Sequence, residues 1–218
     1  MPAGRIEPFV MDDCCSHKGA ELERLARQKH HRRVLIAVLG INAAMFAIEF
    51  VAGVIAGSVS LMADAVDMFG DAMVYGLTLY ALDRSERWRN GAAVAKGAFI
   101  LVFGLGVILQ VANKIQNGVE PSSTIMLSVG GLALAANLAC FAMLWRFRKQ
   151  DLNMSSTFEC SRNDVIANVG VVVAAVAVAL IHSPWPDILI GLIIAALFLR
   201  SAWRVLAEVV PAFRAGAH

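Results

Sequence analysis

The sequence has 218 residues, of which 58% are hydrophobic and only 17% are charged, with a mean hydropathy of +0.65. These values exclude an ordinary soluble domain and predict an all-α polytopic membrane protein embedded in the lipid bilayer. The formal net charge of +2 excludes little by itself, but the basic residues lie where membrane topology needs them, so we expect no nucleic-acid partner.

Residues 1–33 form a polar segment that we expect to be cytoplasmic and helical from Ala20. The segment contains Cys14, Cys15 and His17, and thiolates and imidazoles are ligands that zinc prefers. Capture of metal in the cytoplasm is therefore one interpretation. Adjacent cysteines are awkward chelators, however, and the same basic segment also suits a membrane surface, so both interpretations stay open.

Six apolar segments follow, each close to the ~20 residues with which a helix crosses about 30 Å of hydrocarbon. We predict transmembrane helices near residues 34–56, 59–82, 92–114, 124–145, 157–181 and 186–206. Residues 34–206 are thus expected to form a single six-helix transmembrane domain, followed by a short cytoplasmic tail at 207–218.

Lys and Arg are unequally distributed between alternate connections. The N-terminal segment has seven, the second and fourth loops have three each, and the C-terminal end has three. The other loops have none, and Lys114 only borders the third. Because cations accumulate on the cytoplasmic side, we predict six spans with the N- and C-termini both cytoplasmic. The expected location is the cell membrane, as in a bacterial inner membrane.

The predicted second span contains three carboxylates within an apolar run. At about 100° per residue, one narrow helix face carries Ser60, Asp64, Asp67, Asp71 and Tyr75. A charged side chain near the bilayer centre costs roughly 2.5–3.5 kcal/mol on insertion scales. We therefore expect this face to meet water, a partner charge or a bound cation.

The predicted fifth span carries a second polar stretch with the same spacing. Cys160 and Asp164 are four residues apart, as are Asp67 and Asp71, so each pair lies on one helix face, one turn apart. Two helices that present these pairs to each other would supply three carboxylates and a thiolate around one point. Such a tetrahedral set suits zinc, and its sulfur favours the softer cadmium.

Other polar residues at membrane depth have more than one interpretation. Asp64 and Glu49 are either proton or pathway groups or partners in interhelical hydrogen bonds. Asn168 continues the face of the fifth-span pair and is a candidate for supporting the ligands or lining the pathway. For the second-span pair, the structural alternative is an ion pair with Arg162 or Lys96 that only holds helices together.

At these residues the chain resembles the cation diffusion facilitator family of divalent-metal/proton antiporters. The run Ser-Leu-Met-Ala-Asp-Ala-Val-Asp-Met-Phe-Gly-Asp is similar to the family's second-span signature, whose His/Asp-x-x-x-Asp pair falls on Asp67 and Asp71. The run Glu-Cys-Ser-Arg-Asn-Asp is similar to the fifth-span signature, whose pair falls on Cys160 and Asp164. The resemblance covers residues from about 34 to 206.

The resemblance implies a secondary active transporter rather than an enzyme, with no cofactor. It would move Zn²⁺ or Cd²⁺, with Co²⁺ as a further candidate, out of the cytoplasm in exchange for protons, and would act as a homodimer in metal resistance. Cys160 stands where the family usually has His or Asp, which favours softer ions. We also expect a short member without the family's C-terminal cytoplasmic domain. A passive divalent-cation channel and a membrane-embedded metal sensor are the alternatives.

Overall fold

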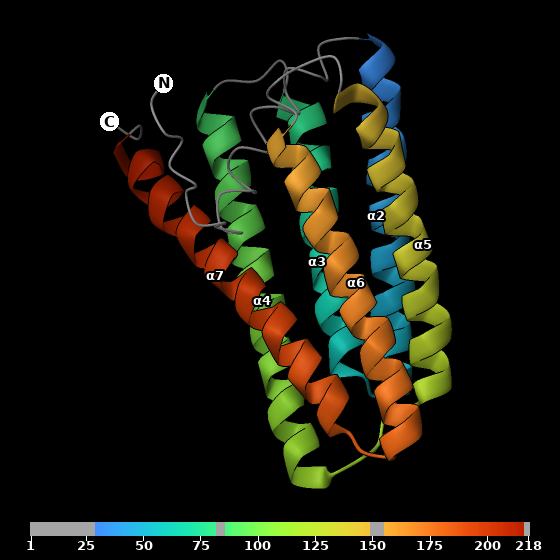
Figure 1. Cartoon of the computed structure of the whole chain (residues 1–218). Helices are drawn as coiled ribbons and strands as arrows, with labels where there is room; N and C mark the ends of the chain where they lie inside the picture. The colour runs from blue at the N-terminus through green and yellow to red at the C-terminus, as the bar shows by residue number, and fades with distance from the viewer. Residues whose placement is uncertain (1–28, 82–85, 149–154, 216–218) are drawn as a thin grey trace, which may run out of the picture.

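A computed structural model describes residues 29–81, 86–148 and 155–215, and every regular element in these ranges is an α-helix (Figure 1). The helices are α2 (Lys29–Ala56), α3 (Val59–Ala81), α4 (Glu86–Asn117), α5 (Ser123–Arg148), α6 (Ser155–Ile181) and α7 (Trp185–Ala215). Each predicted apolar segment corresponds to one of these helices, which extend beyond most of the predicted ends. The predicted helical start at Ala20 lies outside the described residues.

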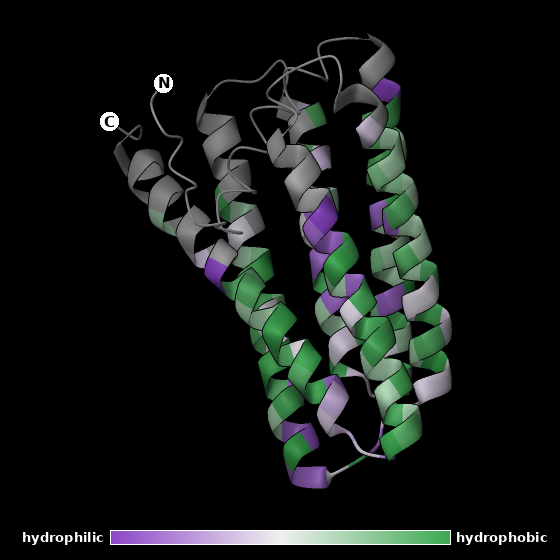
Figure 2. Ribbon diagram, viewed as in Figure 1, coloured by the Kyte–Doolittle hydropathy of each residue, from purple (hydrophilic) through white to green (hydrophobic). Residues whose placement is uncertain are grey.

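Four of the described helices contain a stretch long and apolar enough to cross a membrane. These stretches are Arg32–Ala56, Gly97–Asn117, Ser123–Trp145 and Arg162–Ile181, in α2, α4, α5 and α6. Large hydrophobic side chains are exposed along the helices, as expected where lipid replaces water. Figure 2 shows that most of the coloured ribbon is hydrophobic. The chain is therefore a multi-pass membrane protein. The count of six spans and the cytoplasmic position of both termini stay predictions.

The helix with the carboxylates, α3, lies inside the bundle and packs against α2, α4, α6 and α7. From Val59 to Asp67 almost every side chain of α3 is buried. Four residues of the predicted polar face, Ser60, Asp64, Asp67 and Tyr75, are buried, while Asp71 is half-buried. The carboxylates on this helix therefore lie among other helices. That the whole face meets water, a partner charge or a bound cation stays a prediction.

The helices α4 and α7 pack closely against each other, and α7 crosses α4 obliquely (Figure 1). In Figure 1, α7 begins beside the end of α6 and diverges from it toward its own C-terminal end, where it lies beyond α4. An apolar core joins this pair to α3 and α6, and includes Ala63, Val66, Val107, Ile188 and Ala195. The contact surface between α3 and the α4–α7 pair thus combines this aliphatic core with contacts of the Phe69 ring on α3 to Phe99 and Phe103 on α4.

A buried ion pair holds the end of the bundle at which α2 turns into α3. Lys114 Nζ on α4 lies 2.8 Å from Asp187 Oδ2 on α7, and the two side chains are 5% and 0% exposed. The same carboxylate accepts hydrogen bonds from Ser58 Oγ at 2.7 Å and Ser60 Oγ at 2.6 Å. It also accepts from the backbone N–H groups of Val59 at 2.8 Å and Ser60 at 3.0 Å. We call these groups the Asp187 network.

The Asp187 network caps α3 from another helix. The first N–H groups of a helix have no partner within that helix, and a carboxylate placed there also matches the positive end of the helix dipole. Lys114 Nζ completes the arrangement by donating to the carbonyl of Gly57, in the α2–α3 turn. The turn itself depends on Gly57, whose φ of +62° lies in the left-handed region. The network thus fixes where α3 begins and how it is rotated.

One turn beyond Asp187, α7 approaches the start of α3 so closely that only glycine fits. A Cβ atom added to Gly191 would lie 2.5 Å from Val59 Cγ1 and 2.9 Å from the backbone nitrogen of Ser60. Backbone atoms cannot move aside as a flexible side chain can. This close approach lets Asp187 reach the N–H groups of α3.

We therefore expect Gly191→Ala to lower the stability of the protein by about 1–3 kcal/mol, the usual effect of overpacking. The measurement is the midpoint of thermal unfolding in detergent, followed by size-exclusion chromatography. Gly106→Ala on α4 is the matched control, because a Cβ there meets nothing within 4 Å. An unchanged midpoint in Gly191→Ala would show that the α3–α7 contact is looser than described.

Candidate metal centre

A second group of buried polar side chains lies in the middle of the bundle, away from the Asp187 network. It combines Glu49 on α2, Asp64 and Asp67 on α3, and Asn168 on α6. Glu49, Asp64 and Asn168 are 0% exposed, and Asp67 is 8% exposed. We call this group the carboxylate cluster. Hydrophilic turns on α3 and α6 are visible at this level in Figure 2.

One amide connects the parts of the carboxylate cluster. Asn168 Nδ2 donates to Asp64 Oδ1 at 3.1 Å and to the backbone oxygen of Asp164 at 3.0 Å. The carboxyl group of Glu49 is close enough to interact electrostatically with Asp64 and with Asp67. Side chains from three helices therefore meet around Asp64.

The carboxylate cluster has more acceptors than donors. Both carboxylate oxygens of Glu49, Oδ2 of Asp64 and Oδ1 of Asn168 are buried without a hydrogen-bond partner. In a low-dielectric interior, buried acceptors without a partner are costly, and neighbouring negative charges are more so. A bound cation or proton would remove that cost. The middle of the bundle is therefore suited to hold positive charge.

The predicted ligand pairs lie on two helices that pack against each other, α3 and α6. Asp67 is buried, while Asp71 and Asp164 are half-buried. The backbone of α6 includes position 160, but the side chain of Cys160 lies outside the described part of the chain. Among the described side chains, no three His, Cys, Asp or Glu residues converge as a metal cage. The four-ligand set stays a prediction.

Several other sequence predictions fall outside what the structure describes. Cys14, Cys15 and His17 lie within the undescribed residues 1–28, so cytoplasmic metal capture is untested. The side chain of Lys96 is likewise not described. For Asp64, the hydrogen bond with Asn168 fits the interhelical interpretation and does not exclude a pathway role.

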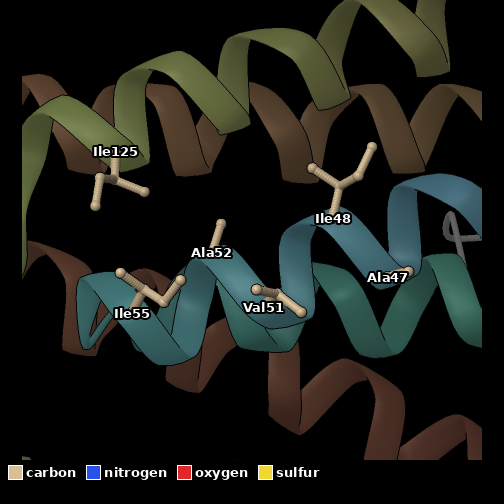
Figure 3. A pocket seen from close by; sticks show the side chains of 6 residues that line it. All are labelled: Ala47, Ile48, Val51, Ala52, Ile55 and Ile125. Atoms are coloured by element: carbon tan, nitrogen blue, oxygen red, sulfur yellow. The ribbon is translucent and has the colours of Figure 1, made fainter.

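An apolar groove on α2 is separate from the carboxylate cluster. Its lining, shown in Figure 3, consists of Ala47, Ile48, Val51, Ala52, Ile55 and Ile125. None of these side chains offers a ligand atom for a cation. The candidate metal centre is therefore the interior of the bundle around α3.

Sequence reasoning missed the most highly connected polar group of the described helices, the Asp187 network. Lys114 borders the third loop, as the sequence indicates, and the structure in addition buries it and pairs it with Asp187. A cation that is buried at the end of an apolar span needs such a partner. The available signal was the presence of this lone Lys together with Asp187, at span ends on the same side of the membrane.

Comparisons with known proteins agree with the resemblance in the sequence. Residues 35–213 match the family model described as "Cation efflux transmembrane domain". The "Cadmium, cobalt and zinc/H(+)-K(+) antiporter" of Bacillus subtilis is 27% identical over 186 residues, which cover 79% of this chain and 60% of that protein.

Two further relatives have a similar sequence identity to this chain. The "Zinc transporter ZitB" of Escherichia coli is 26% identical over 208 residues, which cover 88% of this chain and 66% of that protein. The "Metal cation efflux system protein CzcD" of Cupriavidus metallidurans is 26% identical over 200 residues, covering 83% of this chain and 63% of that protein. The chain thus spans about three fifths of the length of the curated relatives it matches. Since the family model matches most of the chain, this protein belongs to the cation efflux family of membrane transporters.

Proposed function

We propose that this protein exports Zn²⁺ or Cd²⁺ from the cytoplasm in exchange for protons, with Co²⁺ as a further cargo. The observation that carries the proposal is the buried carboxylate cluster between α2, α3 and α6, where acceptors outnumber donors inside a membrane bundle. Intramembrane ionisable residues mark ion pathways in general. The name of the Bacillus subtilis relative, an antiporter of cadmium, cobalt and zinc against protons and potassium, supports the same class of reaction.

In this proposal Asp67 and Asp71 of α3 and Cys160 and Asp164 of α6 are the ligands of the transported ion. The two pairs lie on helices in contact, and each pair spans one helical turn. Carboxylates and a thiolate give a four-coordinate site for a d-block cation, and the sulfur increases the preference for cadmium. Coordination takes place without a covalent step.

Proton exchange follows from the chemistry of these ligands. A thiol or carboxyl group must lose its proton before it binds the metal, so loading releases protons and protonation expels the metal. Asp64 and Glu49 extend the acidic region from α3 to α2, and Asn168 joins Asp64 to the segment that carries Asp164. We assign these three residues to the pathway around the site. Exchange then requires only that the bundle opens to each side in turn.

The first prediction concerns coupling and the role of Asp71. Cadmium uptake into proteoliposomes should accelerate when their interior is acidic, because protons from the interior then bind the ligands and displace the metal into the vesicle. Loss of a residue that only supports a metal ligand reduces metal affinity or activity about ten- to a hundredfold. Asp71→Ala removes a proposed ligand, so it should reduce cadmium uptake by at least this factor. Glu120→Gln, in the exposed turn between α4 and α5, is the matched control.

Uptake that is indifferent to the pH gradient would exclude antiport and favour a passive channel. Binding of cadmium without any uptake would favour a metal sensor. Full uptake by Asp71→Ala would remove this residue from the site, whatever the coupling.

The second prediction concerns ion selectivity. Cys160→His should shift the ratio of cadmium to zinc affinity toward zinc, by about tenfold, because imidazole is a less soft ligand than thiolate. Competition titrations with both metals on the purified protein measure this ratio. Cys140→Ala is the control, since Cys140 is buried in the apolar contact of α2, α3 and α5. An equal ratio in all three proteins would show that Cys160 does not determine the preference.

The third prediction concerns Asn168. Asn168→Ala removes the donor to Asp64 and with it the side-chain hydrogen bond that joins α3 to α6 beside Asp164, so cadmium affinity should fall by roughly ten- to a hundredfold. Isothermal titration calorimetry measures the affinity directly. Asn113→Ala, at an exposed position of α4, should bind as the unmodified protein does. Unchanged affinity in Asn168→Ala would separate the carboxylate cluster from the metal site.

A further inference from the structure

We infer that the Asp187 network is the outer gate of the cation pathway, an inference that rests on the proposed exchange of metal for protons. The network lies at the α2–α3 turn, on the side that the charges of the loops predict to be outside. It is not part of the candidate metal centre, and the metal chemistry does not use it. Its contacts connect the helices that would have to separate to open the bundle on this side.

The first step is the identity of the connected helices. Asp187 belongs to α7 and Lys114 to α4, while Ser58, Val59 and Ser60 belong to the turn and the start of α3. The contacts of Asp187 and Lys114 therefore run from the α4–α7 pair to α3 and its turn, or within the pair. Opening the bundle between α3 and this pair requires these contacts to break.

The second step is the contrast between this network and the surface beside it. Immediately inward of the network, α3 meets the pair through small and aliphatic side chains such as Ala63, Val66 and Ile188. Such surfaces have no directional bonds, so the contacts across them weaken gradually as the helices move apart. The hydrogen bonds of the Asp187 network, in contrast, form only within narrow limits of distance and angle. The interface between α3 and the α4–α7 pair is therefore either held by these bonds or open at this end.

The third step is the chemistry of the carboxylate. Asp187 accepts five hydrogen bonds, from two hydroxyls, two backbone N–H groups and the Lys114 ammonium group. Removing one partner of a buried ion pair leaves an uncompensated charge, so the contacts form and break together. The described arrangement is thus bonded at this end of the bundle, which is the closed state of the gate.

The experiment measures access from each side of the membrane. The reporter is Ala63→Cys, at a position that is 1% exposed in the core beside the network. The native cysteines are replaced in the background Cys14→Ser, Cys15→Ser, Cys140→Ala, Cys160→Ser. A membrane-impermeant methanethiosulfonate reagent is added to right-side-out or inverted vesicles without metal or a pH gradient.

We expect Asp187→Asn to raise the labelling rate of the reporter from the outer face at least about fivefold, because the ion pair no longer favours the closed state. Ser60→Ala removes one hydroxyl donor and leaves the ion pair in place. It should give a smaller increase in the labelling rate from the same face. If Asp187→Asn does not fold, Ser60→Ala alone tests the gate. Ser128→Ala, at an exposed position on α5, is the control and should leave the rate unchanged.

An unchanged outer labelling rate in both variants would overturn the gate. So would equal increases from the two faces, which indicate general loosening, or an increase from the cytoplasmic face alone. Because labelling needs neither metal nor a pH gradient, its result is independent of the proposed exchange. Outer labelling could increase as expected while the protein with its native cysteines takes up no metal. This result would retain the gate and reject antiport.

Discussion

The Lys114–Asp187 ion pair is the interaction on which the arrangement of the bundle depends. Through it α4 and α7 together cap the first turn of α3, and Ser60 is bonded within this cap. Asp64 and Asp67 follow Ser60 by one and two turns on the same face, so fixing Ser60 also fixes the direction in which the carboxylates point. The position of the candidate metal centre is therefore set from the end of the helix.

The two buried polar groups differ in how completely they are satisfied. Asp187 has five donors, whereas Glu49 has no hydrogen-bond partner for either oxygen, and Asp64 has one donor. Fully satisfied buried networks rigidify a fold, whereas partly satisfied ones need a further partner. The first group therefore forms a fully bonded contact in the described arrangement, and the second group has buried acceptors that a cation or a proton would satisfy.

Helical periodicity was sufficient to predict the elements and the inward face of α3, because three carboxylates in one span have few stable orientations in a lipid-surrounded bundle. Helical periodicity could not predict the pairing of Lys114 with Asp187, because 73 positions separate them and only the packing of α4 on α7 brings them together. The neighbours of Glu49 depend in the same way on how α2 and α3 pack. The joint ligand set of α3 and α6 stays a prediction because it includes Cys160.

The proposed exchange of a cation for protons sets two requirements that oppose each other in a low-dielectric interior. The site must leave its acceptors without partners until the cation arrives, and the helices that carry those acceptors must be held in place without the cation. In this chain the requirements are met at different depths: the Asp187 network holds α3 at the end of the bundle, and the acceptors of Glu49, Asp64 and Asn168 lie farther in. Separating them lets the charge in the middle change while the network is bonded, and the gate that we infer opens when these bonds break. A coupling between the two levels then runs through α3 itself, whose one polar face carries both Ser60 and the carboxylates.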